Sequence, residues 1–203
     1  MKKHFTLTEI LVVVFLIGVL TAIGFGMYSY AMNSAKESAA KALLTRLEAA
    51  LETCNTKLGY IPVSKESREF NEIRFKIDSD GMIINMTFAK EALPDETPPS
   101  TEEQKKFQKE FLRTIDAENL KKNLQKDGSN DYYVLVDGWG NKIYYAYPGR
   151  FNKTGYDLYS AGSDNRLGKD AESVSPENLN KAKQETFKDT ATNEMLCDDI
   201  CNF

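Results

Sequence analysis

The sequence predicts an α+β fold in which a long N-terminal helix packs on a small antiparallel β-sheet. An uncharged apolar stretch at residues 10–35 runs, without proline or further glycine, into an amphipathic stretch that reaches Leu58. Short runs rich in tyrosine and valine follow at residues 131–160, separated by turn residues. A helical segment followed by clustered strands is typical of a helix that covers one face of an antiparallel sheet.

The apolar stretch is long enough to cross a membrane. Residues 10–35 form 26 consecutive positions without a charge, and a spanning helix needs about 20. Lys2 and Lys3 precede the stretch, and the positive-inside rule places them on the cytoplasmic side. We therefore expect the rest of the chain to lie outside the inner membrane.

The helix is expected to continue beyond the membrane as an amphipathic helix. One apolar stripe follows its second half at spacings of three and four residues: Leu43, Leu47, Leu51, Cys54 and Leu58. This spacing places the side chains on one helix face. Gly59 and Pro62 are stop signals. The sequence thus predicts one helix from Phe5 to Leu58.

The remaining elements are expected to be short. Residues 73–88 alternate apolar and polar side chains around Asp80 and Gly81, which predicts a hairpin and explains Asp78 and Asp80 without a metal. Helices are predicted at 101–115, capped by Ser100 or Thr101, and at 117–125. Strands are predicted at 132–137, 142–147 and 155–160. Their alternating faces predict core packing for half of their tyrosines, and the alternative is a stacking platform for sugars or single strands. Residues 173–203 are predicted to form a loop or a short helix.

Composition argues against several classes of function. The formal net charge is -4 and the pI is about 5.2, so no basic face for nucleic acid is indicated. His4 is the only histidine, and a chain cut after it would lack Ser-His-Asp, Cys-His and histidine–zinc sites. No catalytic residue is predicted, and we expect the protein not to be an enzyme.

Three cysteines leave the disulfide pattern open. Cys197 and Cys201 stand close together in "CDDIC", and Cys54 lies on the apolar helix stripe. Outside the cytoplasm a disulfide between Cys197 and Cys201 is expected. A thiolate metal pair is the alternative, although a second pair is missing, and the connectivity does not follow from the sequence.

The stretch "FTLTEILVVVFLIGVL" resembles the type III signal of type IV pilin-like proteins. The resemblance implies a leader at residues 1–4, cleavage between His4 and Phe5 by a prepilin peptidase, and methylation of the new Phe5 amine. Glu9 then occupies the fifth position of the mature chain, where that family carries glutamate. This chain has His4 where the family usually has glycine before the cut.

Residues 137–172 resemble the C-terminal half of the major pseudopilin of type II secretion systems. The residues that carry the resemblance are Asp137, Trp139, Gly140, Asn141, Pro148, Gly149, Tyr156, Asp157, Leu158, Ser160, Gly162 and Asp164. The resemblance implies calcium bound by Asp164, Asp170, Glu172 and the backbone oxygens of Ala161 and Ser163. Asn165 replaces a common glycine, Gly138 a proline, and residues 63–130 exceed the family's usual middle region.

Glu9 is expected to have a role in assembly. A carboxylate beside hydrocarbon is costly, and in a filament it can pair with the Phe5 amine of the next subunit, since opposite charges attract strongly at low dielectric. The alternative is a side chain that reaches back to the membrane interface.

The predicted organisation is a leader (1–4), a transmembrane and filament-core helix (5–32) and a pilin-like globular domain (33–203). The globular domain is expected to comprise 33–58, a variable region at 59–130, the sheet and calcium loop at 131–172, and a tail at 173–203. The expected function is a structural subunit of a helical pseudopilus in type II protein secretion, anchored in the bacterial inner membrane with its globular domain in the periplasm.

The expected partners are copies of the chain, minor pseudopilins, the prepilin peptidase, and the inner-membrane platform with its ATPase. One alternative is a type IV pilin for adhesion, motility or DNA uptake, which the terminal Cys pair favours. A second is a secreted binding protein or enzyme whose ordinary signal peptide ends at Ala31.

Overall fold

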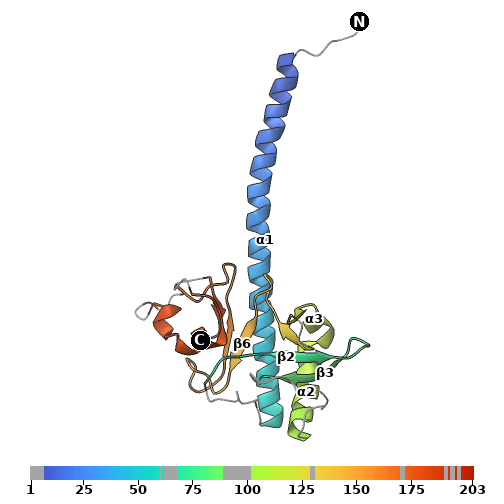
Figure 1. Cartoon of the computed structure of the whole chain (residues 1–203), viewed down its shortest axis with the longest axis vertical. Coiled ribbons are helices and arrows are strands. Elements are labelled where there is room, and N and C mark those ends of the chain that lie inside the picture. The colour runs from blue at the N-terminus through green and yellow to red at the C-terminus, as the bar shows by residue number, and fades with distance from the viewer. Residues whose placement is uncertain are drawn as a thin grey trace. The chain divides into compact units, whose positions relative to one another are not determined.

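A computed structural model (Figure 1) describes residues 7–59, 61, 68–88, 102–128, 131–169, 172–189, 192, 195 and 198–203. The chain divides into two compact units, residues 1–36 and 37–203. Several predicted features lie outside the described residues: His4, Phe5, Ser100, Thr101, Asp170 and Cys197.

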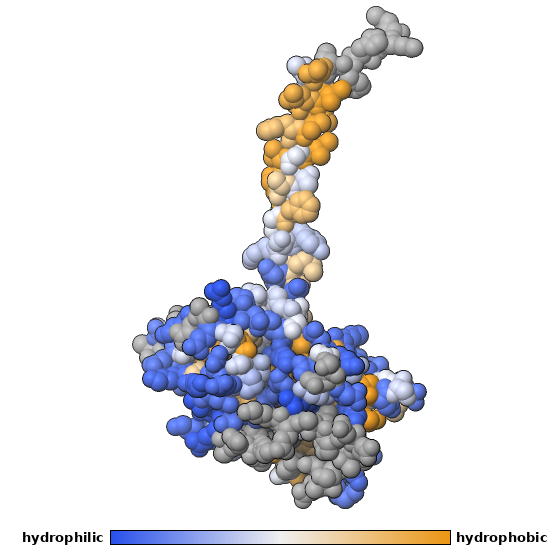
Figure 2. Space-filling view, viewed as in Figure 1, coloured by the Kyte–Doolittle hydropathy of each residue, from blue (hydrophilic) through white to orange (hydrophobic). Residues whose placement is uncertain are grey.

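Helix α1 (Leu7–Leu58) confirms the predicted long N-terminal helix. Its apolar first half is exposed on all sides, and Figure 2 shows the hydrophobic side chains gathered there. By length and composition this half is able to cross a membrane, and no residue of its most apolar segment is buried. Gly59 ends the helix with φ 66°, a conformation that glycine adopts easily, and its N–H donates to the Asn55 oxygen at 2.8 Å.

The second half of α1 provides the core of the globular unit. Leu43, Leu47, Leu51 and Cys54 are buried, as the stripe predicted, but Leu58 is 37% exposed. Leu58 belongs to the last helical turn. Burial of the three leucines contributes about 1.5–3 kcal/mol each, so this stripe is a main source of the domain's stability.

The strands form two four-stranded sheets where the sequence predicted one. The first has the order β1 (Asn71–Glu72), β6 (Ile143–Ala146), β7 (Asp157–Ser160), β8 (Ile200–Cys201). The second has the order β3 (Ile83–Thr87), β2 (Arg74–Ile77), β5 (Tyr133–Leu135), β4 (Leu124–Lys126). All pairs are antiparallel. Residues 71–77 pair first with β6 and then with β5, so one stretch of chain joins both sheets.

The predicted hairpin at Asp80 and Gly81 is confirmed as β2 and β3. Asp78 Oδ1 accepts hydrogen bonds from the N–H groups of Asp80 at 3.0 Å and Met82 at 2.7 Å. Gly81 has φ 78°, which suits glycine in a tight turn. The two aspartates therefore belong to the turn, as the sequence indicated.

In the part of the globular unit that the structure describes, the other helical elements are α2 (Glu102–Ile115), α3 (Ala117–Lys121), α4 (Pro176–Lys181) and η1 (Gln184–Thr186). Phe107 and Phe111 of α2 are buried, which confirms its apolar face. The predicted helix at 117–125 ends earlier, because Leu124 already pairs with Leu135 in β4. The tail at 173–203 contains α4, η1 and β8, more regular structure than the sequence predicted.

The first sheet has a hydrophobic cluster on each face. Tyr145 packs in the cluster that contains Leu47 of α1, and Tyr144 packs with Leu179 and Phe187 on the other side. Neighbouring residues of a strand point to opposite faces. Both rings are buried, although strand alternation predicted core packing for only half of the tyrosines, because each face of this sheet has a core of its own.

Candidate functional site

Residues 137–141 form a turn that holds two distant parts of the chain. Asp137 is buried, and its Oδ1 accepts from the N–H groups of Trp139 at 2.8 Å and Asn141 at 2.9 Å. Its Oδ2 accepts from the Ser160 hydroxyl at 2.6 Å. The Asn141 side chain donates to the Gly162 oxygen at 2.7 Å. The turn thereby fixes the end of β7 and the loop that follows it.

That loop, residues 161–168, approaches other backbone segments closely at both ends. Gly162 has φ 66°, and a Cβ there would lie 2.3 Å from the Asp198 carbonyl oxygen. Gly168 has φ 57°, and a Cβ there would lie 2.5 Å from the Thr186 oxygen. Glycine is required at both positions because no side chain fits between these segments.

Three carboxylates converge beside this loop. Oxygens of Asp164, Asp198 and Asp199 all lie within 4.8 Å of one another. Asp164 and Asp198 are exposed, whereas Asp199 is only 5% exposed. We call this group the acidic cluster. It brings together residues more than thirty positions apart in the sequence.

The loop's N–H groups orient the two later aspartates. Asp198 Oδ2 accepts from the Ser163 N–H and hydroxyl, both at 2.6 Å, and from the Asp164 N–H at 3.2 Å. Burial raises the pKa of Asp198, but these hydrogen bonds outweigh burial and hold that pKa below its usual value. Asp199 Oδ2 accepts from the Gly168 N–H at 2.6 Å. The donors keep both carboxylates turned toward the loop.

The acidic cluster suits a hard divalent cation. Calcium takes six to eight oxygen ligands, mostly carboxylates and carbonyls, and the cluster offers three carboxylates. Thiolate or imidazole ligands, which softer metals prefer, are not part of this group among the described residues.

The structure includes only one predicted carboxylate ligand in the cluster. Asp164 belongs to it, and Ala161 and Ser163 flank Gly162 in the same loop. Glu172 is exposed and lies outside the group of three; its backbone oxygen accepts from the Leu167 N–H at 3.1 Å. Asp170 lies outside the described residues. The calcium ligand set therefore stays a prediction.

Sequence reasoning missed Asp198 and Asp199. Both stand in "CDDIC", whose pattern indicated only a cysteine motif. Cys201 is a free thiol whose Sγ lies 3.9 Å from Met195 Sδ, and burial raises its pKa to about 11. Because Cys197 lies outside the described residues, the Cys197–Cys201 disulfide remains a prediction.

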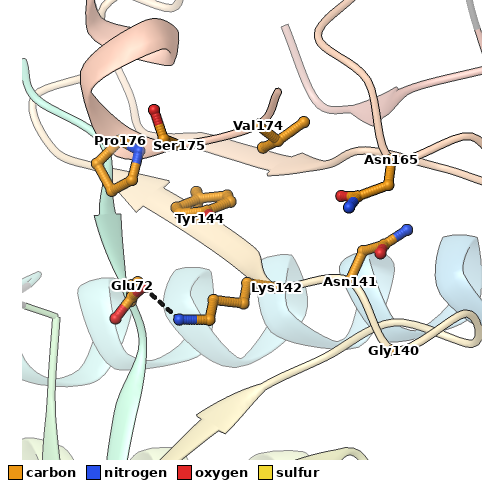
Figure 3. A pocket seen from close by; sticks show the side chains of 9 residues that line it. All are labelled: Glu72, Gly140, Asn141, Lys142, Tyr144, Asn165, Val174, Ser175 and Pro176. Carbon is orange, nitrogen blue, oxygen red and sulfur yellow. Dashed lines mark hydrogen bonds and ion pairs between the residues drawn. The ribbon is translucent and has the colours of Figure 1, made fainter. Parts of the chain in front are cut away.

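A polar cleft of about 380 Å³ adjoins the loop (Figure 3). Its lining residues are Glu72, Gly140, Asn141, Lys142, Tyr144, Asn165, Val174, Ser175 and Pro176. Glu72 and Lys142 form an ion pair of 2.8 Å at one side. Asn165, which has φ 54°, comes from the loop itself. Lys142 is already paired with two carboxylates, Glu72 and Asp127. Its positive charge is therefore balanced and does not favour an anionic ligand in the cleft.

At the other end of the chain, Glu9 lies in the first turn of α1 and is exposed. An acid there interacts favourably with the helix dipole. Its predicted partner Phe5 lies outside the described residues, and the pairing would join two chains, so it remains a prediction.

Part of the globular unit is similar to a known protein family. Residues 97–177, 81 of 203, match the model of the family "Type II secretion system (T2SS), protein G". This segment is similar to the protein G family of type II secretion systems. The match supports the predicted resemblance to pilin-like pseudopilins.

The matched segment runs from α2 to the start of α4 and contains the 137–141 turn and the 161–168 loop. It begins at residue 97, so part of the middle region that we expected to lie outside the resemblance belongs to it. It ends before Asp198 and Asp199. No curated protein and no solved structure is significantly similar to the chain.

Proposed function

We propose that this chain is a structural subunit of the pseudopilus of a type II protein secretion system, assembled into a helical filament from the inner membrane. The observation that carries the proposal is the combination of the protein G match over residues 97–177 of the globular unit with an α1 half that is apolar and exposed on every side. An apolar helix of this length is stable in lipid or against copies of itself. Repeated head-to-tail contacts that do not close give a filament.

In this proposal Glu9 fixes the position of each subunit along the filament. The methylated Phe5 amine of one subunit neutralises Glu9 of its neighbour in the apolar core. Minor pseudopilins, the prepilin peptidase, the inner-membrane platform and its ATPase are the partners. Lys2 and Lys3 stay cytoplasmic and the globular unit faces the periplasm.

N-terminal sequencing and filament imaging test the proposal. We expect N-methyl-Phe5 at the mature N-terminus, and we expect Glu9→Ala to insert in the membrane but to abolish filaments. The matched control is Glu37→Ala, which removes an exposed acid of the same helix that pairs with Lys41. A mature chain that begins at Met32 would instead indicate a secreted protein. Normal filaments from Glu9→Ala would refute the pairing.

We also propose that the loop at 161–168 binds calcium. Asp164 and the backbone oxygens of Ala161 and Ser163 would hold the ion, together with Asp170 and Glu172 as the resemblance implies. Bound calcium would supply positive charge that offsets the repulsion among neighbouring carboxylates. The oxygen donors of the acidic cluster support this proposal.

A further inference from the structure

The polar cleft of Figure 3 lies over one face of the first sheet. Tyr144, in β6, stands between Ser175 on one side and Lys142 on the other. Strand β6 is paired with β1 and with β7, so its backbone is already hydrogen-bonded on both sides. A ligand in the cleft therefore meets side chains and cannot add to β6 as a further strand, which is how many extended peptides bind.

Tyr144 carries a hydroxyl for which the fold provides no partner. Its ring packs in the cluster of Leu179 and Phe187, and the residue is only 4% exposed. Among the residues that the structure describes, none forms a hydrogen bond with this hydroxyl. A hydroxyl that leaves water without a partner costs free energy, and Phe151 and Phe187 contribute rings to the same cluster without one. Packing alone thus does not account for tyrosine at this position, whereas a ligand in the cleft would.

The polar groups of the cleft can both donate and accept hydrogen bonds. Burial raises the pKa of Tyr144 to about 12, so at neutral pH this group keeps its proton and acts as donor and acceptor. Ser175 Oγ accepts from the Asn178 N–H at 3.2 Å, and its own hydrogen is available to a ligand. The exposed Asn165 adds an amide oxygen and amide N–H donors. Together these groups match a ligand that carries several hydroxyl groups.

Charged side chains at the cleft balance one another. Glu72 lies 2.8 Å from Lys142 and 3.0 Å from Arg74. Lys142 also lies 2.8 Å from Asp127. Two acids are therefore matched by two bases. A charged ligand would bring an unpaired charge into a partly buried site, which is costly, so the cleft favours a neutral ligand.

Size and apolar lining narrow the ligand further. The cleft has a volume of about 380 Å³, in the lower part of the range of small-molecule sites, roughly 300–1,000 Å³. Val174 and Pro176 add apolar surface beside the polar groups. A sugar ring has the same combination, since its hydroxyl groups surround the ring and its C–H groups form apolar faces. A neutral sugar therefore fits this cleft in size, polarity and charge.

We propose that the cleft is a binding site for a neutral saccharide unit, held by hydrogen bonds to Tyr144, Ser175 and Asn165. Val174 and Pro176 contact the C–H face of the ring. The unit is either a free sugar or one residue of a longer glycan, because both present the same hydroxyl groups. The site uses no carboxylate of the acidic cluster and no part of the apolar half of α1, so it adds a ligand-binding role to the proposed structural one.

Titration of sugars into the isotope-labelled full chain tests the proposal, with amide NMR signals as the readout. The chain is held in micelles of a detergent whose headgroup is not a sugar. The probes are glucose, galactose, mannose, N-acetylglucosamine and the neutral disaccharides and tetrasaccharides built from them. We expect at least one to shift the amide signals of Asn141, Asn165 and Ser175. Glucosamine and glucuronate, which carry a charge, are expected to bind at least about tenfold more weakly.

Single substitutions test the named hydrogen bonds. Tyr144→Phe removes only the hydroxyl and is expected to weaken binding about tenfold, with a melting temperature that is equal or higher because the hydroxyl has no partner in the fold. Tyr156→Phe is the matched control: its hydroxyl donates to the Glu48 oxygen at 3.3 Å on the other face of the sheet, so binding is expected not to change. Asn165→Gly removes the amide but suits φ 54°. It is expected to weaken binding about threefold or more, and it gives the same test if Tyr144→Phe does not fold.

The outcomes decide the ligand class. A tetrasaccharide that binds more tightly than its single sugar would indicate a longer glycan, and equal affinity would indicate a free sugar. Absence of a shift with every neutral sugar would overturn the proposal, as would equal affinity of the wild type and Tyr144→Phe or tighter binding of glucuronate. Shifts of the same signals by an uncharged peptide alone would assign the cleft to a protein partner instead. None of these results bears on the filament role, which the modified Phe5 terminus and the Glu9→Ala filaments decide.

Discussion

Acidic side chains are concentrated in two regions of the globular unit, and the two regions differ in whether basic side chains balance the negative charge. One, which we call the charge network, contains Glu72, Arg74, Asp127 and Lys142, two acids with two bases. The other is the acidic cluster of Asp164, Asp198 and Asp199, three acids together. In the first region the fold provides the opposite charges, whereas in the second a cation from solution can provide them.

The charge network joins both sheets. Lys142 Nζ lies 2.8 Å from carboxylate oxygens of both Glu72 and Asp127, and Arg74 lies 3.0 Å from Glu72. Asp127 accepts from the Tyr132 hydroxyl at 2.8 Å, and the Arg74 guanidinium lies 4.6 Å from the Tyr132 ring centroid. Each member thus has a partner, and the stability of this region is expected not to depend on added ions.

The first prediction has the largest effect and concerns calcium. At free calcium about 100 times the dissociation constant, binding is expected to stabilise the domain by about 2.7 kcal/mol, which shifts the melting temperature by roughly 5–10 °C. Asp164→Asn is expected to lose this shift, as measured by thermal unfolding with calcium or with chelator. Lys142→Met is the control and is expected to keep the shift. If calcium raised the melting temperatures of the wild type and of Asp164→Asn equally, the acidic cluster would not be the region that responds to calcium.

The second prediction concerns the charge network. Lys142→Met removes the ammonium between Glu72 and Asp127, whose side chains are only 12% and 22% exposed. We expect a loss of about 1–3 kcal/mol in the free energy of unfolding, with or without calcium. Denaturant titration in detergent measures it. Lys181→Met, at an exposed pair on α4, is expected to cost less than about 1 kcal/mol; similar losses in both variants would refute the distinction.

The third and smallest prediction concerns alkaline pH. Burial lowers the pKa of Lys142, but the carboxylates of Asp127 and Glu72 more than offset this and raise that pKa above its usual 10.5. A raised pKa stabilises the fold below the unfolded-state pKa of about 10.4 and ceases to do so as pH rises through the folded-state pKa. Burial also raises the pKa of Tyr144, to about 12, with the same sign.

We therefore expect the denaturant concentration at which half of the protein is unfolded to decrease as the pH rises from 10 to 12. Lys142→Met is expected to show a shallower fall than the wild type, because one of the groups that titrate is gone. A steeper fall in the variant, or no fall in the wild type, would show that these groups do not control stability in this range.

The sequence predicted the elements whose signals are local. The helix to Leu58 follows from spacing and from Gly59, and the hairpin follows from Asp80 and Gly81. The split into two sheets was not predictable, because residues 72–77 show one continuous alternation of polar and apolar side chains and nothing local marks the change of partner at Ile73. Strand pairing at long range depends on packing that a local pattern does not encode.

The candidate site shows the same limit. Asp164 was found because its neighbours resemble a known loop, whereas Asp198 and Asp199 reach it only through the pairing of β8 with β7. Two adjacent acids between the cysteines were the available signal. A two-residue strand carries too little pattern to predict its partner. The contact between residues 198–201 and the loop at 161–168 could therefore be found only in the folded structure.

The adjacent rings of Tyr144 and Tyr145 have a consequence for how this domain forms. A register shift of β6 by one residue would move each ring into the hydrophobic cluster on the other face of the sheet. Each ring would then lose the contacts that it makes in its own cluster. The hydrophobic clusters on the α1 side and on the tail side of the sheet must therefore form together during folding. A chain shortened before α4 would leave an aromatic face open to water, and aggregation rather than a smaller stable domain is the expected fate.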